Sequence, residues 1–380
     1  MDRRAFVRLL AGVPLAASVT PPARLPRLHV VTKYQPRPDL GMPGPYPGVV
    51  AQIRSDRSVD STTGAANAEV VREMLERGIC TLTGDASPDE AWRRFFTPAD
   101  IVGLKVNCGG YPYCISAYEI VSEVVRRLTA LGVPPTNIYV YERFQNQMDE
   151  CNYAAHLPEG VQSVAAESAN RHADNSGYDP FTYIEADFFG EDDTRSNMMR
   201  LVSERLTKII NIPNMKDHRA AGVTGCLKNI AYGSFSNVAR THYRGRSHTY
   251  SFVGALASVE PLRSRTVLQI MDGLRGVWHG GPFARTDKYV FYPKRILIGT
   301  DPVAIDRLMR DVVDQKRTEA GALSIFNRSP EKVRMDQATE RNQGPDVDII
   351  FREPEHIEYA ATLGLGVADR AKIVVRDVQL

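Results

Sequence analysis

Short apolar runs alternate with amphipathic segments along most of the chain. The runs are rich in β-branched residues, which is typical of strands buried on both faces of a sheet. They lie at residues 49–53, 101–106, 138–142, 207–212, 267–272, 295–299 and 372–378. Segments with helical periodicity lie between them, at residues 66–78, 116–131, 224–232, 302–315 and 354–363. This alternation predicts an α/β fold with a mainly parallel β-sheet flanked by helices.

Local signals agree with these boundaries. Asp301 and Pro302 stand where the helix at 302–315 begins, a pattern typical of an N-cap followed by proline in the first turn. Gly364 follows the last predicted helix and is expected to be its C-cap. Residues 144–198 are polar and predict an excursion or cap outside the core.

The N-terminus has the order of an export signal. Arg3 and Arg4 precede Phe6, a mildly apolar run and a region of small residues, and this order resembles a twin-arginine signal. We therefore expect residues 1–25 to be a twin-arginine-type signal peptide and residues 26–380 to form a single large α/β domain. The expectation implies the twin-arginine export machinery as a partner and a periplasmic or otherwise exported protein. An amphipathic N-terminal helix is the alternative.

Charge and composition exclude several classes of protein. The 47 Lys and Arg residues nearly balance the 45 Asp and Glu residues and form no block of one sign, so no nucleic-acid partner is expected. No apolar run approaches the ~20 residues of a membrane-spanning helix, so no stable membrane span is expected. The five cysteines form no C-x-x-C pair, which argues against a ferredoxin-type iron–sulfur cluster. Cys108 and Cys114 either pair with each other or remain buried thiols.

Ionisable and amide side chains follow five of the predicted strands. Because ligands of parallel sheets bind beyond the carboxyl ends of the strands, we expect these side chains to meet in one pocket. They are Lys105, Asn107, Glu142, Arg143, Lys216, His218, Asp272, His279 and Asp301. Each one taken alone also has a structural explanation.

The structural explanations differ from residue to residue. Asp301 could serve only as an N-cap, and Lys105 could pair with a neighbouring carboxylate. Asn107 could make a local turn, and His279 could be an exposed loop residue. Glu142, like Arg143 beside it, is expected to pair with neighbours at the surface.

The stretch GVTG at residues 222–225 leads into the predicted helix at 224–232. Gly222 and Gly225 would let backbone N–H groups approach a ligand, and the helix N-terminus favours an anion. Thr224 is a candidate cap, and the spacing to Lys228 lacks the length and final Ser or Thr of a P-loop. The alternative is an ordinary tight turn before a helix.

The cations Lys105, Lys216, Arg219 and Lys228 predict a positively charged mouth and an anionic small molecule as ligand. Asn107, Gly222, Thr224, Gly225 and Asn229 complete the expected ligand-binding set. His218 has the ordinary pKa of a general acid–base residue, so the expected catalytic residues are His218, Lys216 and Asp272. A metal ion is a further possibility, with Asp272, Asp301, His242 and His279 as the ligands.

Several stretches resemble one protein family. VGLKVNCGG, INIPNMKDHRAAGVTGCLKNIAYG, DGLRGVWHGGP, LIGTDPVAIDRL and ATLGLG occur in this order and are similar to the domain-of-unknown-function family 362, in its exported branch. The resemblance runs from about residue 95 to the C-terminus. It implies that eleven residues occupy family motif positions: Lys105, Asn107, Lys216, His218, Thr224, Lys228, Asn229, His242, Asp272, His279 and Asp301. Some relatives carry an appended ferredoxin module, for which this chain lacks the cysteines.

These observations together predict an exported α/β enzyme that binds an anionic small molecule or cofactor at the strand ends. Twin-arginine export commonly carries proteins that fold around a cofactor first, which modestly favours redox chemistry. A non-catalytic ligand-binding or carrier protein would use the same cationic pocket and is the alternative. A structural or interaction module explains the residues at the strand ends least well.

Overall fold

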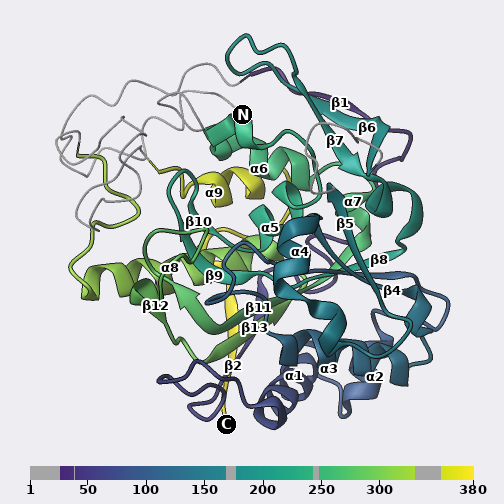
Figure 1. Cartoon of the computed structure of the whole chain (residues 1–380), viewed down its shortest axis with the longest axis vertical. Helices are drawn as coiled ribbons and strands as arrows, with labels where there is room; N and C mark the ends of the chain where they lie inside the picture. The colour runs from purple at the N-terminus through teal and green to yellow at the C-terminus, as the bar shows by residue number, and fades with distance from the viewer. Residues whose placement is uncertain (1–25, 38, 168–176, 243–247, 330–351) are drawn as a thin grey trace.

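The computed structural model describes residues 26–37, 39–167, 177–242, 248–329 and 352–380 (Figure 1). The expected signal peptide at residues 1–25 lies outside the described residues. Helices cover both faces of a central sheet, and the C-terminal strand lies at one edge of that sheet beside β2 (Figure 1).

The main sheet is mixed but mostly parallel. Its strands follow the order β14-β2-β13-β11-β8-β3-β4-β5. In chain order they are β2 (Val49–Arg54), β3 (Val102–Lys105), β4 (Ile138–Phe144), β5 (Gln162–Glu167), β8 (Lys208–Asn211), β11 (Thr266–Val277), β13 (Arg295–Gly299) and β14 (Val374–Gln379). Only β13 runs against the others of this path. The predicted α/β fold with a mainly parallel sheet is confirmed.

Each buried strand sends alternate side chains into two separate cores. Ile210 and Ile270 face a core beneath one layer of helices, whereas Ile209 and Met271 face the core on the opposite side. The first layer contains α1 (Ala68–Thr83), α2 (Pro88–Arg93) and α3 (Tyr118–Ala130). The second contains α5 (Cys226–Tyr232), α6 (Thr249–Ala257), α8 (Pro302–Glu319) and α9 (His356–Thr362). Burial on both faces explains the continuous apolar runs of these strands.

Helix ends follow the expected signals. Asp301 caps α8, because its Oδ1 accepts a hydrogen bond from the Ala304 N–H at 2.8 Å, and Pro302 occupies the first turn. Gly364 follows α9 with a φ of 73°, the left-handed conformation that glycine adopts most readily. The N-cap expected at Asp301 is therefore confirmed, whereas the C-cap of α9 is Leu363 and Gly364 is the residue that follows it.

Residues 144–198 divide between two sheets. Strand β5 pairs with β4 and extends the main sheet, and the helix α4 (Gln145–Cys151) lies between these two strands in the chain. The strands β6 (Tyr178–Glu185) and β7 (Arg195–Met199) pair with each other, and β6 also pairs with β1 (His29–Val31), in a separate three-stranded sheet. Of the described strands in this range, only β6 and β7 lie outside the main sheet. Their side chains Tyr178, Ile184, Met198 and Met199 nevertheless belong to one of the two main cores, so this segment is not outside the core as expected.

A short strand, β9 (Asn214–His218), adds to the carboxyl half of β11 and forms a hairpin with β10 (Gly222–Thr224). Lys216 and His218 point to one side of β9 because side chains alternate along a strand. Asp217 points to the other side and is fully buried. Its Oδ2 lies 3.4 Å from Arg317 Nη1 and 3.3 Å from Arg352 Nη1, which ties β9 to α8 and to the C-terminal segment.

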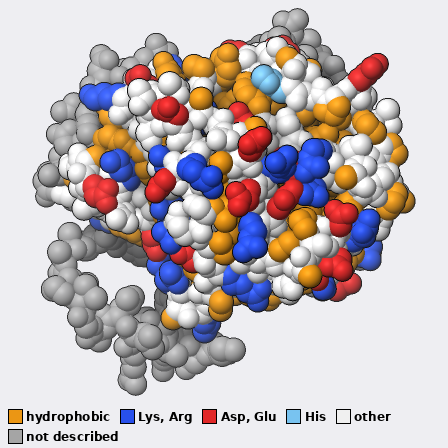
Figure 2. All heavy atoms as spheres, turned by 90° about the horizontal axis from the view of Figure 1, so that it is seen from below, with side chains coloured by type: hydrophobic (Ala, Val, Ile, Leu, Met, Phe, Trp, Pro, Cys, Tyr) orange, Lys and Arg blue, Asp and Glu red, His pale blue; other side chains and the backbone are white. Residues whose placement is uncertain are grey.

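Charges are interspersed on the outer surface. Figure 2 shows Lys and Arg side chains alternating with Asp and Glu side chains on the face turned to the viewer, without a broad area of one sign. This agrees with the small net charge of +2.

The charge cluster around Asp217 generates a prediction about stability. The substitution Asp217→Ala is expected to lower the free energy of unfolding by about 3–5 kcal/mol, because it removes the carboxylate between two buried guanidinium groups. Urea denaturation at neutral pH measures the change. Asp311→Ala is the matched control, since Asp311 makes an exposed pair with Arg307 one helical turn away, and should cost less than about 1 kcal/mol. Equal effects of the two substitutions would contradict the role assigned to Asp217.

Candidate functional site

The parallel strands bring several chain segments to one edge of the sheet. β3, β4, β8 and β11 run in the same direction, so their carboxyl ends share that edge. Lys105 of β3 lies opposite Asn211 of β8, and Asn211 lies opposite Gln269 of β11. Lys216 and His218 reach the same region because β9 pairs in parallel with the distal half of β11.

A hydrogen-bond network centred on Asn229 of α5 joins these strand ends. Its Oδ1 accepts hydrogen bonds from Lys105 Nζ at 3.3 Å and from Asn107 Nδ2 at 3.1 Å. Its Nδ2 donates to Asn211 Oδ1 at 2.8 Å, and Asn211 Nδ2 donates to Gln269 Oε1 at 2.8 Å. The structure therefore places Lys105, Asn107 and Asn229 together and fixes α5 over the strand ends.

Lys105 is fully buried and forms an ion pair. Its Nζ donates to Glu142 Oε1 at 2.9 Å and to the carbonyl oxygen of Val106 at 2.6 Å. The alternative that Lys105 pairs with a neighbouring carboxylate is confirmed. The expectation of a surface pairing for Glu142 is wrong, because Glu142 is buried at the end of a central strand. Gly233 is required beside the pair, since a Cβ there would lie 2.2 Å from Lys105 Cε.

Lys216 is also fully buried and joins the network through Asn107. Its Nζ donates to Asn107 Oδ1 and, at 3.3 Å, to the carbonyl oxygen of Cys114. Burial lowers the pKa of Lys216, while the nearby charge of Glu142 acts in the opposite direction. Glu142 therefore acts on both buried ammonium groups.

His218 is fixed in one neutral form by the backbone. Its Nδ1 accepts hydrogen bonds from the N–H groups of Ala220 and Ala221, both at 3.1 Å. The ring proton must therefore be on Nε2, which is a hydrogen-bond donor. Burial, followed by the charge of Lys228, holds the pKa of His218 well below its usual range. These contacts argue against the predicted general acid–base role, because neither ring nitrogen takes up a proton near neutral pH.

His242 has the opposite tautomer. Its Nδ1 lies 3.2 Å from the carbonyl oxygen of Ala239, which can only accept, so Nδ1 carries the proton and Nε2 carries a lone pair. The His242 ring lies 5.2 Å from the His218 ring and 5.4 Å from the Tyr232 ring, measured between centroids. A proton donor and a proton acceptor therefore stand side by side.

Lys228 completes this second cluster, which we call the Lys228 cluster and define as Lys228, Tyr232, His218 and His242. Lys228 is 8% exposed, and its Nζ lies 4.2 Å from the centroid of the Tyr232 ring. In the described part of the chain Lys228 makes no hydrogen bond or ion pair. Burial, and then the charge of Arg143, lowers the pKa of Lys228 to about 7. This lysine is consequently poised between its charged and neutral forms.

The predicted anion site at the start of α5 is already occupied by the protein itself. The carboxylate of Asp306 on α8 accepts hydrogen bonds from the N–H groups of Cys226 at 2.6 Å and Leu227 at 2.9 Å. Burial raises the pKa of Asp306 to about 7. Gly225 makes room for this carboxylate, since a Cβ there would lie 2.1 Å from Asp306 Oδ1. The expectation that this helix N-terminus binds an external anion is wrong.

Two further residues of that turn, Gly222 and Thr224, are also explained by the fold. Gly222 has a φ of 74°, and a Cβ there would lie 2.7 Å from Pro354 Cβ, so glycine is needed for the turn and its packing. Thr224 is buried in β10 and does not cap α5, whose N-cap position is Gly225. The alternative of a tight turn before a helix describes this segment better.

Asp272 lies at the predicted edge but does not orient His218. Its Oδ2 accepts hydrogen bonds from the Ala117 N–H at 2.9 Å and from Asn214 Nδ2 at 3.1 Å, and its Oδ1 accepts from the Leu274 N–H at 3.0 Å. Burial raises the pKa of Asp272 to about 6. The carboxylate thus anchors the start of α3 and the hairpin strand, which is a structural role.

The predicted metal site is not assembled. Asp301 follows β13, the one reversed strand of the main path. It therefore lies at the amino-terminal ends of the parallel strands, away from Asp272. His279 lies beside Arg317 and the Tyr289 ring, whereas His242 belongs to the Lys228 cluster. Across the described ranges, no group of three or more His, Cys, Asp and Glu side chains is arranged to hold a metal ion.

The five cysteines are all free thiols. Cys108 and Cys114 are both buried and unpaired, so the alternative of buried thiols holds and the expected possibility of a disulfide between them is not observed. Burial raises the pKa of Cys114 to about 11, which keeps this thiol protonated.

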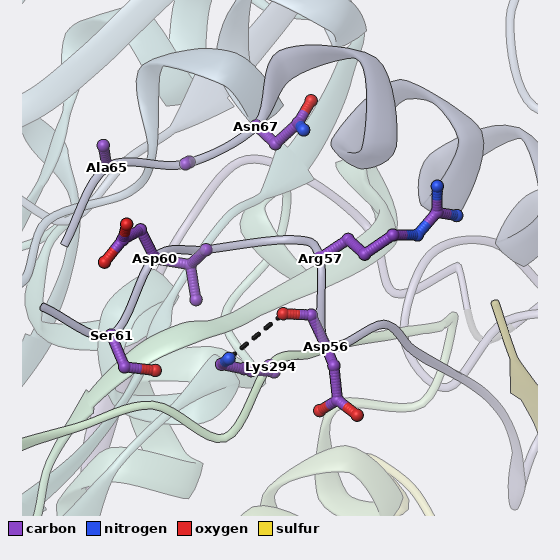
Figure 3. A pocket seen from close by; sticks show the side chains of 9 residues that line it. Asp56, Arg57, Asp60, Ser61, Ala65, Asn67 and Lys294 are labelled. Atoms are coloured by element: carbon purple, nitrogen blue, oxygen red, sulfur yellow. Dashed lines mark hydrogen bonds between the residues drawn. The ribbon is translucent and has the colours of Figure 1, made fainter. Parts of the chain in front are cut away.

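A surface hollow lies away from these clusters. Figure 3 shows it between the loop after β2 and the loop before β13, where Lys294 Nζ donates to the carbonyl oxygen of Asp56 at 3.0 Å. Asp60 and Ser61 line the same hollow. Because none of the predicted site residues lines it, the hollow plays no part in the candidate site.

Two residues that contact the candidate site, Asp306 and Tyr232, could not be identified from the sequence pattern. Asp306 and Tyr232 lie inside helices where a carboxylate or an aromatic ring is ordinary, and only the folded chain brings them to Cys226 and Lys228. The one available signal was helical spacing, since Lys228 and Tyr232 are four residues apart and must share a helix face.

Comparison with known proteins identifies the family. The model of the family described as a domain of unknown function, DUF362, matches residues 102–311. No curated protein matches the chain significantly. Within the described residues, no helix is long and apolar enough to cross a membrane. Because the family match spans more than half of the 380 residues and includes both clusters at the strand ends, the chain belongs to the DUF362 family.

Proposed function

We propose that this protein is an exported enzyme that binds an anionic small molecule at the Lys228 cluster. The observation that carries the proposal is the buried ammonium of Lys228, which has no anionic partner among the residues that the structure describes. A charge taken out of water costs several kcal/mol unless it is paired. An anion bound from outside would supply the missing partner.

The surroundings of Lys228 favour a ligand of negative charge. Burial, and then the guanidinium of Arg143, lowers the pKa of Lys228. Burial also lowers the pKa of His218, and the charges of Lys228 and Arg352 act in the same direction. Arg143 itself donates to Glu167 at 2.8 Å and keeps its own carboxylate partner. The excess of positive charge is thus local to the cluster, where it attracts and orients an anion.

Catalysis is favoured over simple binding by the paired tautomers of the two histidines. His218 presents an N–H group and His242 presents a lone pair, so a bound molecule would meet one proton donor and one proton acceptor beside a cation. A carrier protein needs only the cation. A non-catalytic periplasmic carrier remains the second candidate, and it is favoured if binding occurs without turnover.

Export rests on the N-terminal sequence. Arg3, Arg4 and Phe6 followed by the apolar run support a twin-arginine signal and hence a periplasmic or otherwise exported enzyme. The machinery that recognises this signal is accordingly proposed as a partner.

Removing the Lys228 charge is expected to abolish anion binding. Oxalate and inorganic phosphate should raise the melting temperature of the wild-type protein at pH 6.5 and should not raise that of Lys228→Met. The surface variant Lys372→Met is the control, because Lys372 is largely exposed, and it should respond like the wild type. Above pH of about 7 the affinity should fall about tenfold per pH unit, since binding then requires uptake of a proton by Lys228. Anion stabilisation that survives in Lys228→Met would refute the proposed site.

The same substitution should change the pH dependence of stability. The pKa of Lys228 is lowered by folding from 10.5 to about 7, so the charged form destabilises the folded state fully below pH of about 7 and no longer above pH of about 10.5. Lys228→Met should therefore be more stable than the wild type at pH 6, by an upper limit of roughly 4–5 kcal/mol at 1.36 kcal/mol per pKa unit. The advantage should shrink as the pH rises to 10. Urea denaturation of both proteins at each pH measures it, and a pH-independent difference would contradict the assignment.

The double substitution Arg3→Lys with Arg4→Lys is expected to leave precursor in the cytoplasm, because the paired arginines are the recognised element of the signal. Arg8→Lys lies in the same segment and should be exported normally. Cell fractionation followed by detection of the mature chain distinguishes the two. Normal export of the double variant would argue against the twin-arginine route.

A further inference from the structure

We propose that Lys228 acts as a nucleophile that forms an imine with a carbonyl-bearing anion of the 2-oxo acid class, with His242 transferring the protons. This inference rests on the proposed anion-binding function and names the substrate class and the reacting atom. It requires a lysine with a free amine, a neighbouring proton acceptor, and a field that favours a carboxylate next to the carbonyl.

The hydrogen bonds distinguish Lys228 from the other buried lysines of the site. Lys105 Nζ donates to three oxygen atoms, and Lys216 Nζ donates to two. Within the described portion of the chain, Lys228 Nζ has only the face of the Tyr232 ring. Its lone pair is therefore available once the proton leaves.

Burial and a neighbouring cation are the two conditions that activate lysine for nucleophilic attack. Lys228 meets both, because its side chain is almost fully buried and Arg143 lies near enough to disfavour its ammonium form. The neutral amine is consequently well populated near neutral pH, whereas an exposed lysine with a pKa near 10.4 has very little of it.

The reaction balances with water as its only by-product. The Lys228 nitrogen attacks the carbonyl carbon, and the electrons of the C=O π bond move to oxygen. Both protons of the amine pass in turn from nitrogen to this oxygen, the C–O bond breaks, and water leaves as the C=N bond forms. No oxidant or reductant is needed. His242 Nε2 carries a lone pair that can accept a hydrogen bond from the amine. Because burial lowers the pKa of His242 to about 3, the ring relays each proton to the departing oxygen without holding it at neutral pH.

The cluster also favours a carboxylate beside the reacting carbonyl. A protonated imine keeps the positive charge at Lys228, and a carboxylate one bond away pairs with it. The Nε2–H of His218 adds a neutral donor for an oxygen of the ligand. The flat ring of Tyr232 lies 4.2 Å from the nitrogen and offers a surface against which a planar imine can pack.

Reductive trapping tests the inference. The full chain is incubated with pyruvate and sodium cyanoborohydride at pH 7.5, and the adduct is located by peptide mass mapping. We expect one reduced adduct on the peptide containing Lys228, with a trapping rate that rises with pH through about 7, because attack needs the neutral amine. Methyl pyruvate keeps the ketone and has no charge. Its ratio of Lys228 labelling to surface-lysine labelling should therefore be lower than the ratio obtained with pyruvate.

Two variants separate this inference from the proposed function. Lys228→Arg removes the amine, so no adduct should form at this position, whereas oxalate stabilisation of the wild-type protein tests the anion site by itself. His242→Gln should slow trapping about 100-fold, as expected for loss of a proton-transfer group. His156→Gln is the control, since His156 is exposed and stacks on Tyr118 away from the cluster.

Each outcome decides one of the two proposals. Adducts spread evenly over surface lysines, or an unchanged adduct yield in Lys228→Arg, would overturn the imine. Oxalate stabilisation without any trapped adduct in the wild type would leave the anion site intact and reject the nucleophile. Absence of both effects would reject the anion site and the imine together.

Discussion

The carboxylate of Glu142 is the constraint on which the architecture of the site depends. Lys105 and Lys216 are both fully buried, and Glu142 is the carboxylate whose charge acts on both. A buried ammonium is costly unless oxygen atoms surround it. The side chains of Asn107 and Asn229 must therefore present their oxygens to the lysines, which fixes the orientation of both amides.

The position of α5 follows from this requirement, and the position of Lys228 follows from α5. Asn229 holds the middle of the helix to the strand ends, while Asp306 holds its first N–H groups. Neighbouring residues of a helix point about 100° apart, so fixing Asn229 toward the network turns Lys228 away from it. Lys228 then lies over Tyr232, one turn further along the same helix. The polar network thereby sets the direction of the Lys228 side chain.

The sequence pattern predicted the strands of the main sheet well because these strands are buried on both faces, which produces continuous apolar runs. Every predicted run became a strand of the main sheet, from β2 to β14. Apolar pattern reports burial and carries no information on strand direction. The reversed direction of β13 could not be foreseen, and it moved Asp301 to the opposite edge from Asp272. Polar strands such as β6 and β9 have no apolar run and were missed for the same reason.

The sequence predicted which residues meet at the strand ends, but it did not predict the role of each residue there. Lys105, Asn107, Lys216 and Asn229 meet because the carboxyl ends of parallel strands must meet. Their hydrogen-bond partners come from remote segments, and no local pattern encodes them. Asp306 is 80 residues from Cys226, and its carboxylate fills the glycine-lined helix N-terminus that the sequence pattern assigned to a ligand.

The contrast between Lys228 and the other buried cations is the strongest reason to regard it as functional. In the described segments Lys105 pairs with Glu142, Arg143 with Glu167, and Arg317 with Asp217. Lys216 instead donates hydrogen bonds to an amide and a carbonyl oxygen, so each of these buried cations has oxygen partners. At Lys228 the fold supplies an aromatic face and two neutral histidines. A methionine of similar length would remove the penalty of the unpaired charge, so a lysine at this position is best explained by a negatively charged molecule or by a reaction that needs the amine.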